Sequence, residues 1–281
     1  MENRNITQEL IKEYEIHLKN EEKSQNTLDK YLRDVKAFAM YMGDRVVTKS
    51  DVVAYKNDLI KQQYAIRSIN SMLASLNSLF SFLGWNDCKV KNIRVQRQLF
   101  CPIEKELTKV EYERLVMTAK NMGNDRLYLV LQTICGTGIR VGELQYITVE
   151  AAKTGKAKVL LKGKNRDIFI VSELKKKLLN YAKKHNIFSG PIFITTKGNV
   201  ISRTNIWREM KNLCRYAKVN PEKVFPHNLR HLFARSFYSI QKDIAKLADV
   251  LGHSSIETTR IYITTTGEEH LQNMKRMRLI I

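Results

Sequence analysis

The chain has 281 residues, of which 43% are hydrophobic, so it can form extensive cores, and its length favours two compact domains over one. Its 48 lysines and arginines against 28 aspartates and glutamates give a net charge of +20, which indicates either a polyanionic partner such as nucleic acid or a merely soluble basic protein. No apolar run approaches the roughly 20 residues of a membrane span, and the N-terminus is too polar for a signal peptide, so we expect a cytoplasmic protein without a membrane partner.

The first 85 residues predict a bundle of four helices. Apolar side chains recur at helical spacing in four stretches, residues 11–18, 28–42, 53–59 and 69–83. The sequence from Thr48 to Asp51 has the pattern of a capping box and predicts the start of the third helix, and Gly84 predicts the end of the fourth. We therefore expect an N-terminal helical domain over residues 1–85.

Residues 86–106 show no clear period and contain several basic side chains and Pro102. We interpret them as an interdomain linker whose basic side chains can contact a phosphate backbone. An ordinary solvated loop is the alternative.

The four cysteines give no metal-binding pattern. No pair has C-x-x-C spacing, and no histidine lies at zinc-finger distance from a pair of cysteines, which are Cys88, Cys101, Cys135 and Cys214. We expect structural thiols in a reducing compartment, with no metal and no cofactor.

The second domain is expected over residues 107–281. A capping box from Thr108 to Glu111 predicts its first helix. Two β-rich runs, 159–161 and 168–171, are separated by a turn-like segment and predict a hairpin, and residues 191–195 suggest a third strand. The rest has the pattern of helices up to about residue 276, so the fold class is mainly α with a small β-sheet.

Five separated segments of this second domain carry residue types that can take part in chemistry. Each one alone has an ordinary structural explanation, such as a hairpin tip, a helix end or a packing residue. They are GTGIRVGEL (136–144), LLKGKNRDIFI (160–170), HNLRH (227–231), LGHSS (251–255) and TTRIY (258–262).

In order and spacing, these segments resemble the tyrosine recombinases, also called phage-type integrases, and in particular Xer-like members without an arm-binding domain. The resemblance covers most of the chain. The N-terminal bundle, including QNTLDKYLRDVKAFAMYM (25–42), is similar to the core-binding domain of that family, and the remainder is similar to its α+β catalytic domain.

The resemblance implies that two arginines, Arg140 and Arg230, hold the phosphate. A guanidinium suits this role because it stays cationic and can bond to two oxygens at once. Glu143 either orients Arg140 or is a plain surface carboxylate. His231, which is adjacent to Arg230, is expected to point elsewhere on the helix and to be structural.

The resemblance also implies that Tyr262 is the nucleophile. Since a tyrosine hydroxyl normally has a pKa of about 10, it needs a proton acceptor, and His227 can accept its proton directly or through water. His253 is expected to donate a hydrogen bond to a non-bridging oxygen. Lys162 aligns with the lysine that protonates the leaving oxygen in this family, and Lys164 is the alternative.

The expected function is cleavage and rejoining of DNA strands through a 3′-phosphotyrosine, without metal or ATP. The expected partners are double-stranded DNA and further copies of this chain, forming a tetramer on two DNA sites. An apolar set within residues 271–281 suggests a tail that docks on a neighbouring protomer, or else on its own domain. Integration or excision of a mobile element is the preferred role; Xer-type chromosome dimer resolution, DNA inversion, a type IB topoisomerase and a non-catalytic DNA-binding regulator are alternatives.

Overall fold

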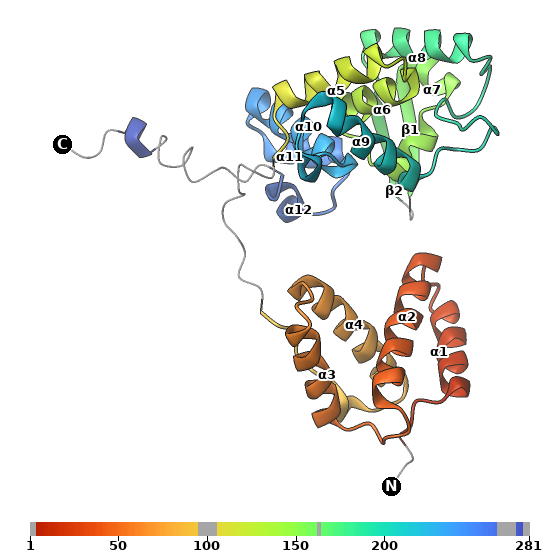
Figure 1. Cartoon of the computed structure of the whole chain (residues 1–281), viewed down its shortest axis with the longest axis vertical. Helices are drawn as coiled ribbons and strands as arrows, with labels where there is room; N and C mark the ends of the chain where they lie inside the picture. Colours follow the sequence, from red (N-terminus) through yellow and green to blue (C-terminus); the bar gives the residue numbers. More distant parts are fainter. Residues whose placement is uncertain (1–3, 95–105, 162–163, 263–273, 278–281) are drawn as a thin grey trace. The chain divides into compact units, whose positions relative to one another are not determined.

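The computed structural model describes residues 4–94, 106–161, 164–262 and 274–277, and the chain divides into two compact units, Met1–Arg97 and Gln98–Ile281 (Figure 1). The described chain is mostly helical with one small sheet, which confirms the predicted fold class. None of its described helices is long and apolar enough to cross a membrane. Lys162 and most of the predicted tail lie outside the described residues.

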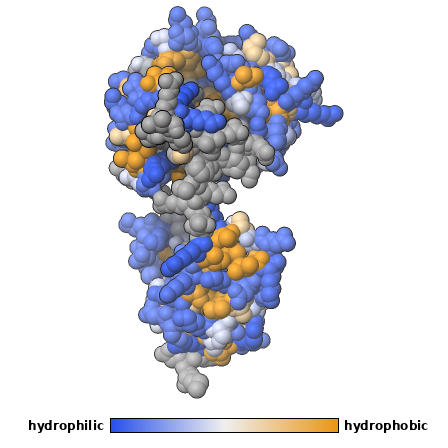
Figure 2. All heavy atoms as spheres, turned by 90° about the vertical axis from the view of Figure 1, so that its left-hand side faces the viewer, coloured by the Kyte–Doolittle hydropathy of each residue, from blue (hydrophilic) through white to orange (hydrophobic). Residues whose placement is uncertain are grey.

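The first unit is a bundle of four helices, as the spacing of its apolar residues predicted. The helices are α1 (Gln8–Asn20), α2 (Gln25–Met42), α3 (Lys49–Lys61) and α4 (Ile66–Phe82). Their apolar sides form one core that includes Tyr14, Phe38 and Phe80. The predicted capping box starts α3, with the Thr48 amide donating to Asp51 at 3.1 Å and the Asp51 amide donating to Thr48 at 3.4 Å. Further hydrophobic side chains gather on the face of this unit that Figure 2 presents.

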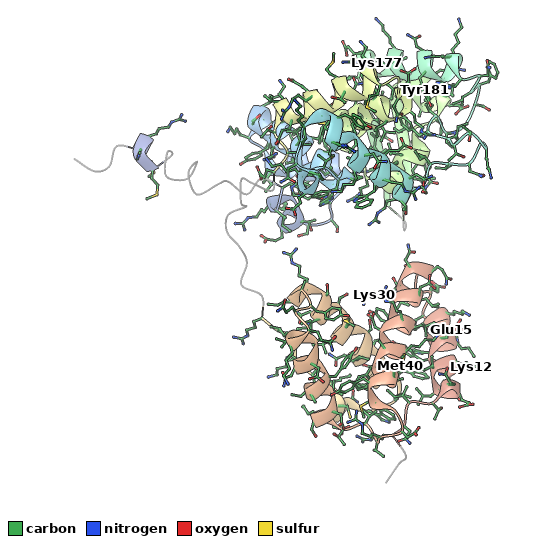
Figure 3. The ribbon with its side chains drawn as sticks, in the orientation of Figure 1. Lys12, Glu15, Lys30, Met40, Lys177 and Tyr181 are labelled. Carbon is green, nitrogen blue, oxygen red and sulfur yellow. The ribbon has the colours of Figure 1, made fainter. Side chains whose placement is uncertain are left out.

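A buried polar contact joins α2 to α4. Lys30 of α2 points toward α4 (Figure 3), where its Nζ donates to Asp34 Oδ2 at 2.7 Å and to the Ser71 carbonyl and the Ser75 hydroxyl at 2.8 Å each. Asp34 is only 2% exposed, and it also accepts a hydrogen bond from Ser75 at 2.9 Å. Because a buried charge is tolerated only when it is paired, this network restricts how the two helices can pack.

The stretch expected to be a linker from residue 86 starts instead as part of the first unit. After the short 3-10 helix η1 (Asn86–Cys88), Cys88 and Val90 are buried in the bundle core. The Asn77 side chain bonds to both the amide and the carbonyl of Val90, at 3.1 and 2.9 Å. This segment is therefore held against the bundle by hydrogen bonds from the Asn77 side chain of α4, and it has no periodic pattern of apolar residues.

The second unit contains eight labelled α-helices, a hairpin and two labelled 3-10 turns, and its described residues 274–277 are also helical. In chain order these are α5 (Lys109–Asn121), α6 (Asp125–Thr137), η3 (Val141–Tyr146), α7 (Val149–Thr154), β1 (Lys156–Leu161), β2 (Lys164–Phe169), α8 (Ser172–Lys184), α9 (Arg203–Ala217), η4 (Pro221–Lys223), α10 (Pro226–Gln241), α11 (Ile244–Leu251) and α12 (Ile256–Arg260). The predicted capping box of Thr108 and Glu111 starts α5.

The predicted hairpin is present, but the predicted third strand is wrong. Strands β1 and β2 pair antiparallel, with Leu161 opposite Lys164 and Val159 opposite Arg166. Residues 191–195 join no described sheet and make only isolated bridges, Thr148 to Pro191 and Ile194 to Val200. A short apolar run can pack into a core without a neighbouring strand, as Ile192 and Phe193 do here.

Helix α6 lies at the centre of the second unit and positions the site. It packs against α5, α8 and α10, and most of its circumference is buried. The end of α6, the turn η3, the first turns of α10 and the end of α11 come together on one side of this core, and the predicted site residues are found there.

Candidate active site

Arg140 follows the end of α6. This helix ends at Gly138, whose φ of +64° is left-handed and where a Cβ atom would lie only 2.5 Å from the Phe233 ring, so the position requires glycine. Arg140 then precedes η3, where its amide and its Nη1 each donate to the Glu143 carboxylate at 3.0 Å. The Arg140 side chain is 41% exposed, whereas that of Glu143 is 2% exposed. Glu143 therefore orients Arg140 and is no surface carboxylate.

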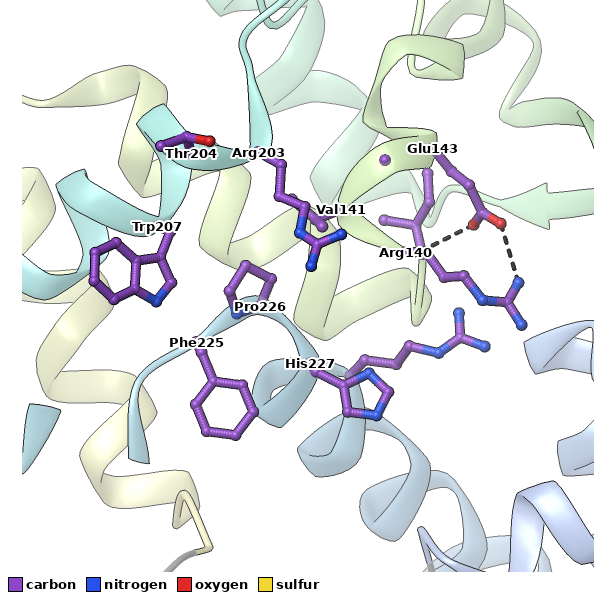
Figure 4. Close-up of a pocket in the computed structure, with 12 residues that line it drawn as sticks. Arg140, Val141, Glu143, Arg203, Thr204, Trp207, Phe225, Pro226 and His227 are labelled. Atoms are coloured by element: carbon purple, nitrogen blue, oxygen red, sulfur yellow. Dashed lines mark hydrogen bonds and ion pairs between the residues drawn. The ribbon is translucent and has the colours of Figure 1, made fainter. Parts of the chain in front are cut away.

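The Arg140 side chain faces a pocket of about 830 Å³, which His227 and Arg230 also line. Figure 4 shows Arg140 and Glu143 on one side of this pocket and Trp207 with Phe225 on the other. The pocket therefore combines positive charge with exposed aromatic surface.

Arg230 lies in α10 and is the buried arginine of the site, with 1% exposure. Its Nη1 donates to the Gly138 carbonyl, and its Nη2 donates to the Leu251 carbonyl at 2.7 Å and contacts His253 Nε2 at 3.0 Å. Burial and the charge of Arg140 lower the pKa of Arg230 to about 10, so it remains cationic at neutral pH. Its Nε–H is buried and has no hydrogen-bond acceptor among the described residues.

His253 is fixed between α11 and α12. Its Nδ1 lies 3.0 Å from the hydroxyl of buried Thr259, and its Nε2 lies 3.0 Å from Arg230. A guanidinium can only donate, so Nε2 is the acceptor and Nδ1 carries the proton of the neutral ring. Burial and the nearby arginines lower the pKa of His253 to about 4, which agrees with a neutral imidazole. To donate to a phosphate oxygen, His253 Nε2 has to gain a proton and give up the hydrogen bond that it accepts from Arg230.

Tyr262 lies just after α12 and is 6% exposed. Its hydroxyl is 3.3 Å from His227 Nε2. The guanidinium carbon of Arg230 lies 6.0 Å from the centre of its ring, and the His253 ring centre lies 5.2 Å away. The phenol is thus held by its own chain, with a proton acceptor and a buried cation beside it.

His231 is part of this cluster, contrary to the expectation that it points elsewhere. Its ring stacks on Tyr262 with centroids 4.2 Å apart, and it lies 4.8 Å from the His227 ring. Residues four apart share a helix face, so the spacing from His227 to His231 decides its direction. Burial and the neighbouring His227 and Arg230 lower the pKa of His231 to about 4, and burial and nearby arginines also lower that of His227. Both rings are therefore neutral at pH 7.

Arg166 of β2 is a site residue that sequence reasoning missed. Its side chain is 12% exposed and forms an ion pair with Glu143, and its Nη1 donates to the Leu251 carbonyl. A signal was available, because Arg166 shares a strand face with buried Ile168, and a charge on the buried face of a strand requires a partner.

The structure brings together Arg140, His227, Arg230, His253 and Tyr262. Lys162 is outside the described residues, and Lys164 is described only through its backbone in β2, so the choice between the two lysines stays open. Within the described ranges, no group of three or more His, Cys, Asp or Glu side chains could hold a metal ion.

Residues 105–269 match the phage integrase family, and residues 11–87 match the N-terminal SAM-like domain of phage integrases. The chain therefore belongs to the phage integrase family. Its relatives are tyrosine recombinases: XerA of Pyrococcus furiosus is 29% identical over 100% of this chain and 98% of its own, and XerC of Pediococcus pentosaceus is 28% identical over 90% and 92%.

Solved structures show the same fold. A lambda integrase (75-356) dimer bound to a COC′ core site has a TM-score of 0.73 at 20% identity, covering 92% of this chain and 95% of that one. The crystal structure of XerA recombinase has a TM-score of 0.55 at 24% identity, covering 97% and 99%.

Proposed function

We propose that the protein is a site-specific tyrosine recombinase that cuts and rejoins DNA through a covalent bond to Tyr262. The observation that carries this proposal is the position of the Tyr262 hydroxyl, 3.3 Å from His227 and next to buried Arg230. A residue that only packs gains nothing from this combination of proton acceptor and phosphate-binding cation. Family membership supports the same reaction.

In the proposed reaction, Tyr262 Oη attacks a DNA phosphorus atom and loses its proton to neutral His227. Arg140 and Arg230 hold the non-bridging oxygens, whose charge increases in the transition state; preorganised charge of this kind is usually the largest catalytic contribution. The bond to the 5′-oxygen breaks, and Lys162 or Lys164 supplies the proton for the leaving hydroxyl. Attack by a 5′-hydroxyl on the phosphotyrosine reverses these steps, so the scheme needs neither metal nor ATP.

We further propose that the chain acts on double-stranded DNA as a tetramer at two sites. The net charge of +20 supports a DNA partner. Among structural neighbours of the same fold are a lambda integrase dimer on a core site and a tetramer bound to a Holliday junction. Of the tail expected to dock on a neighbour, the described residues are 274–277, where Met274 and Met277 are 59% and 60% exposed.

Integration or excision of a mobile element is the biological role that we propose. The alternative, chromosome dimer resolution, is favoured by one observation: relatives named XerA and XerC match 90–100% of the chain. Deleting the gene distinguishes the two, because loss of dimer resolution produces unsegregated chromosomes, whereas loss of an integrase leaves segregation intact and fixes the element in place.

The reaction is tested with a nicked duplex. The target is first selected from random duplexes by retention on Tyr262→Phe protein, and a nick is then placed so that the cleaved strand loses a short fragment and cannot be rejoined. We expect a denaturant-resistant protein–DNA adduct with wild type and none with Tyr262→Phe. No adduct with wild type, or one that survives this substitution, would overturn the assignment. Relaxation of plasmids regardless of sequence would identify a type IB topoisomerase, and binding without cleavage a regulator.

A further inference from the structure

We propose that Arg166 is a positioning residue that holds Glu143, and through it Arg140, in the geometry that binds the scissile phosphate. This inference rests on the proposed function. It concerns a side chain on the hairpin strand that does not itself line the phosphate-facing pocket.

The connection runs through one buried carboxylate. Glu143 Oε1 accepts from Arg140 Nη1 at 3.0 Å, and Glu143 Oε2 accepts from the Arg140 amide at 3.0 Å and forms the ion pair with Arg166. Glu143 has 2% side-chain exposure and Arg166 has 12%, whereas the Arg140 side chain is 41% exposed. Glu143 therefore orients the exposed Arg140, and Arg166 holds Glu143 from the other side.

A second contact fixes Arg166 itself. The Leu251 carbonyl accepts from Arg166 Nη1 and from Arg230 Nη2, so both guanidinium groups share one acceptor at the end of α11. The next residue, Gly252, has a φ of +63°, and a Cβ atom there would lie 2.4 Å from Arg166 Cδ. The backbone is thus closely fitted to the Arg166 side chain, and Arg140 Nη2 also reaches the Gly252 carbonyl at 3.4 Å.

Without Arg166, the Glu143 carboxylate is held only by Arg140 and can rotate out of its present position. Because Arg140 is long and exposed, it then samples more rotamers, and fewer of them place its guanidinium against the phosphate. Misplacement of a catalytic group by about 1 Å can cost about 100-fold in rate. DNA affinity depends on many phosphate contacts and should change little.

The structure offers a matched control. Arg126 is also a partly buried arginine of the second unit that bonds to one carboxylate and one carbonyl, Glu209 at 2.7 Å and Ile194 at 3.2 Å. It has 28% side-chain exposure, and its partners lie outside the site. Arg126→Met therefore removes the same kind of interactions without disturbing Glu143.

The experiment measures single-turnover adduct formation at saturating nicked DNA, DNA affinity and thermal midpoint for Arg166→Met, Arg166→Lys and Arg126→Met. We expect Arg166→Met to slow cleavage by about 100-fold and to change affinity by less than about threefold. Arg166→Lys should lose about tenfold, since a lysine keeps the charge but cannot bond to Glu143 and Leu251 with the same fork. Arg126→Met should cleave at the wild-type rate.

A substrate with sulfur in place of the bridging 5′-oxygen distinguishes a defect in Arg140 from a defect in the lysine that protonates the leaving group. A thiolate leaves without a proton, so the sulfur substrate rescues any defect in the lysine that protonates the leaving group. We expect Arg166→Met to remain slow on it, because the defect lies in Arg140. Rescue by sulfur, wild-type cleavage by Arg166→Met, or an equal rate loss in Arg126→Met would each overturn the inference.

Arg166→Met leaves a buried carboxylate with one partner fewer and can fail to fold, so the double variant Arg166→Met/Glu143→Gln is made alongside. It should fold and remain slow on both substrates. Adding Arg140→Ala to it should cost only about tenfold more, far less than in the wild-type background, since Arg140 is already displaced. A full additional loss from Arg140→Ala would contradict the connection. Absence of any adduct with wild type would overturn the proposed function, whereas normal cleavage by the Arg166 variants would overturn this inference alone.

Discussion

The imidazole ring of His231 lies against the phenol ring of Tyr262, with centroids 4.2 Å apart and planes inclined by 24°. The stack holds the ring of Tyr262 from one side, while its hydroxyl reaches His227 at 3.3 Å. The same helix turn of α10 thus supplies both the support and the proton acceptor. We infer that this support fixes the direction of the Tyr262 hydroxyl.

We predict that His231→Ala slows adduct formation by about tenfold, because stacked aromatic pairs contribute about 0.5–1.5 kcal/mol beyond the area that they bury. His231→Phe keeps the stack and should stay within about threefold of wild type. Single-turnover cleavage of the nicked duplex measures both. If the alanine variant cleaves as fast as wild type, the stack does not position Tyr262.

The two arginines should respond differently to substitution. Arg140→Ala is expected to cost only about 1 kcal/mol of unfolding free energy, since its side chain is 41% exposed and Glu143 keeps Arg166. Arg230→Ala is expected to cost about 3–5 kcal/mol, because Arg230 is 1% exposed and bonds to acceptors at the ends of α6 and α11. Urea denaturation measures both values.

Cleavage should fall by about 1,000-fold or more in the Arg140→Ala variant, with DNA affinity retained. The Arg230→Ala variant needs a temperature at which it is folded before its rate is compared. Loss of affinity in parallel with cleavage in Arg140→Ala would argue against a role confined to the reacting phosphate.

Stability should fall as the pH is lowered from 6.5 toward 4. The pKa values of His231 and His253 are lowered from 6.5 to about 4, so between these limits the unfolded chain binds protons that the folded chain does not. The stability is complete above pH 6.5 and is lost on acidification. Each pKa change corresponds to about 3 kcal/mol at most, and because both rings are partly solvent-accessible we expect about 3 kcal/mol for the pair.

Urea denaturation at pH 7.5, 5.5 and 4.5 tests this expectation. His231→Phe serves as the comparison, because it removes one titrating ring and keeps the stack, so its stability should fall less over the same range. An equal fall in both proteins would assign the pH dependence to other groups, such as the paired carboxylates.

The domain boundary can be tested with fragments. We propose that residues 1–97 form an independently folding unit, because Cys88 and Val90 are buried in its core and Asn77 fixes the Val90 backbone. A fragment that ends at residue 85 should be less stable by about 2 kcal/mol, from the lost burial of these two side chains. Thermal unfolding followed by circular dichroism measures the difference, and equal midpoints for the two fragments would place the boundary at 85.

Regular periodicity made the helices and the hairpin predictable. The apolar faces of α2 and α4 and the capping boxes of α3 and α5 are local patterns, in which the residues that decide the structure lie within a few positions of one another. The expectation for residues 191–195 was wrong because long-range contacts decide their structure, and long-range contacts also place residues 88–90 in the core of the first unit. Asn77 holds Val90 across 13 positions, and no short window of sequence contains that contact.

The site was predictable to the same extent. Resemblance to a family selected Arg140, His227, Arg230, His253 and Tyr262, and the fold brings them together. The direction of His231 follows from its spacing of four residues from His227, and its adjacency to Arg230 was misleading. The tautomer of His253 and the role of Arg166 depend on the Leu251 carbonyl and on Glu143, which are partners from other elements. Such hydrogen bonds appear only once the chain is folded.

The carbonyl of Leu251, which accepts from both Arg166 and Arg230, gives the residues that follow it a fixed starting point. The segment 252–261 connects that oxygen to Tyr262, so the number of its residues determines the position of the Tyr262 hydroxyl relative to the two guanidinium groups. One inserted or deleted residue there would move Tyr262, the proposed nucleophile, while leaving the arginines in place. Natural or designed variation in chain length should therefore be absent from this segment and concentrated in exposed connections such as residues 185–190, where no reacting group depends on the count.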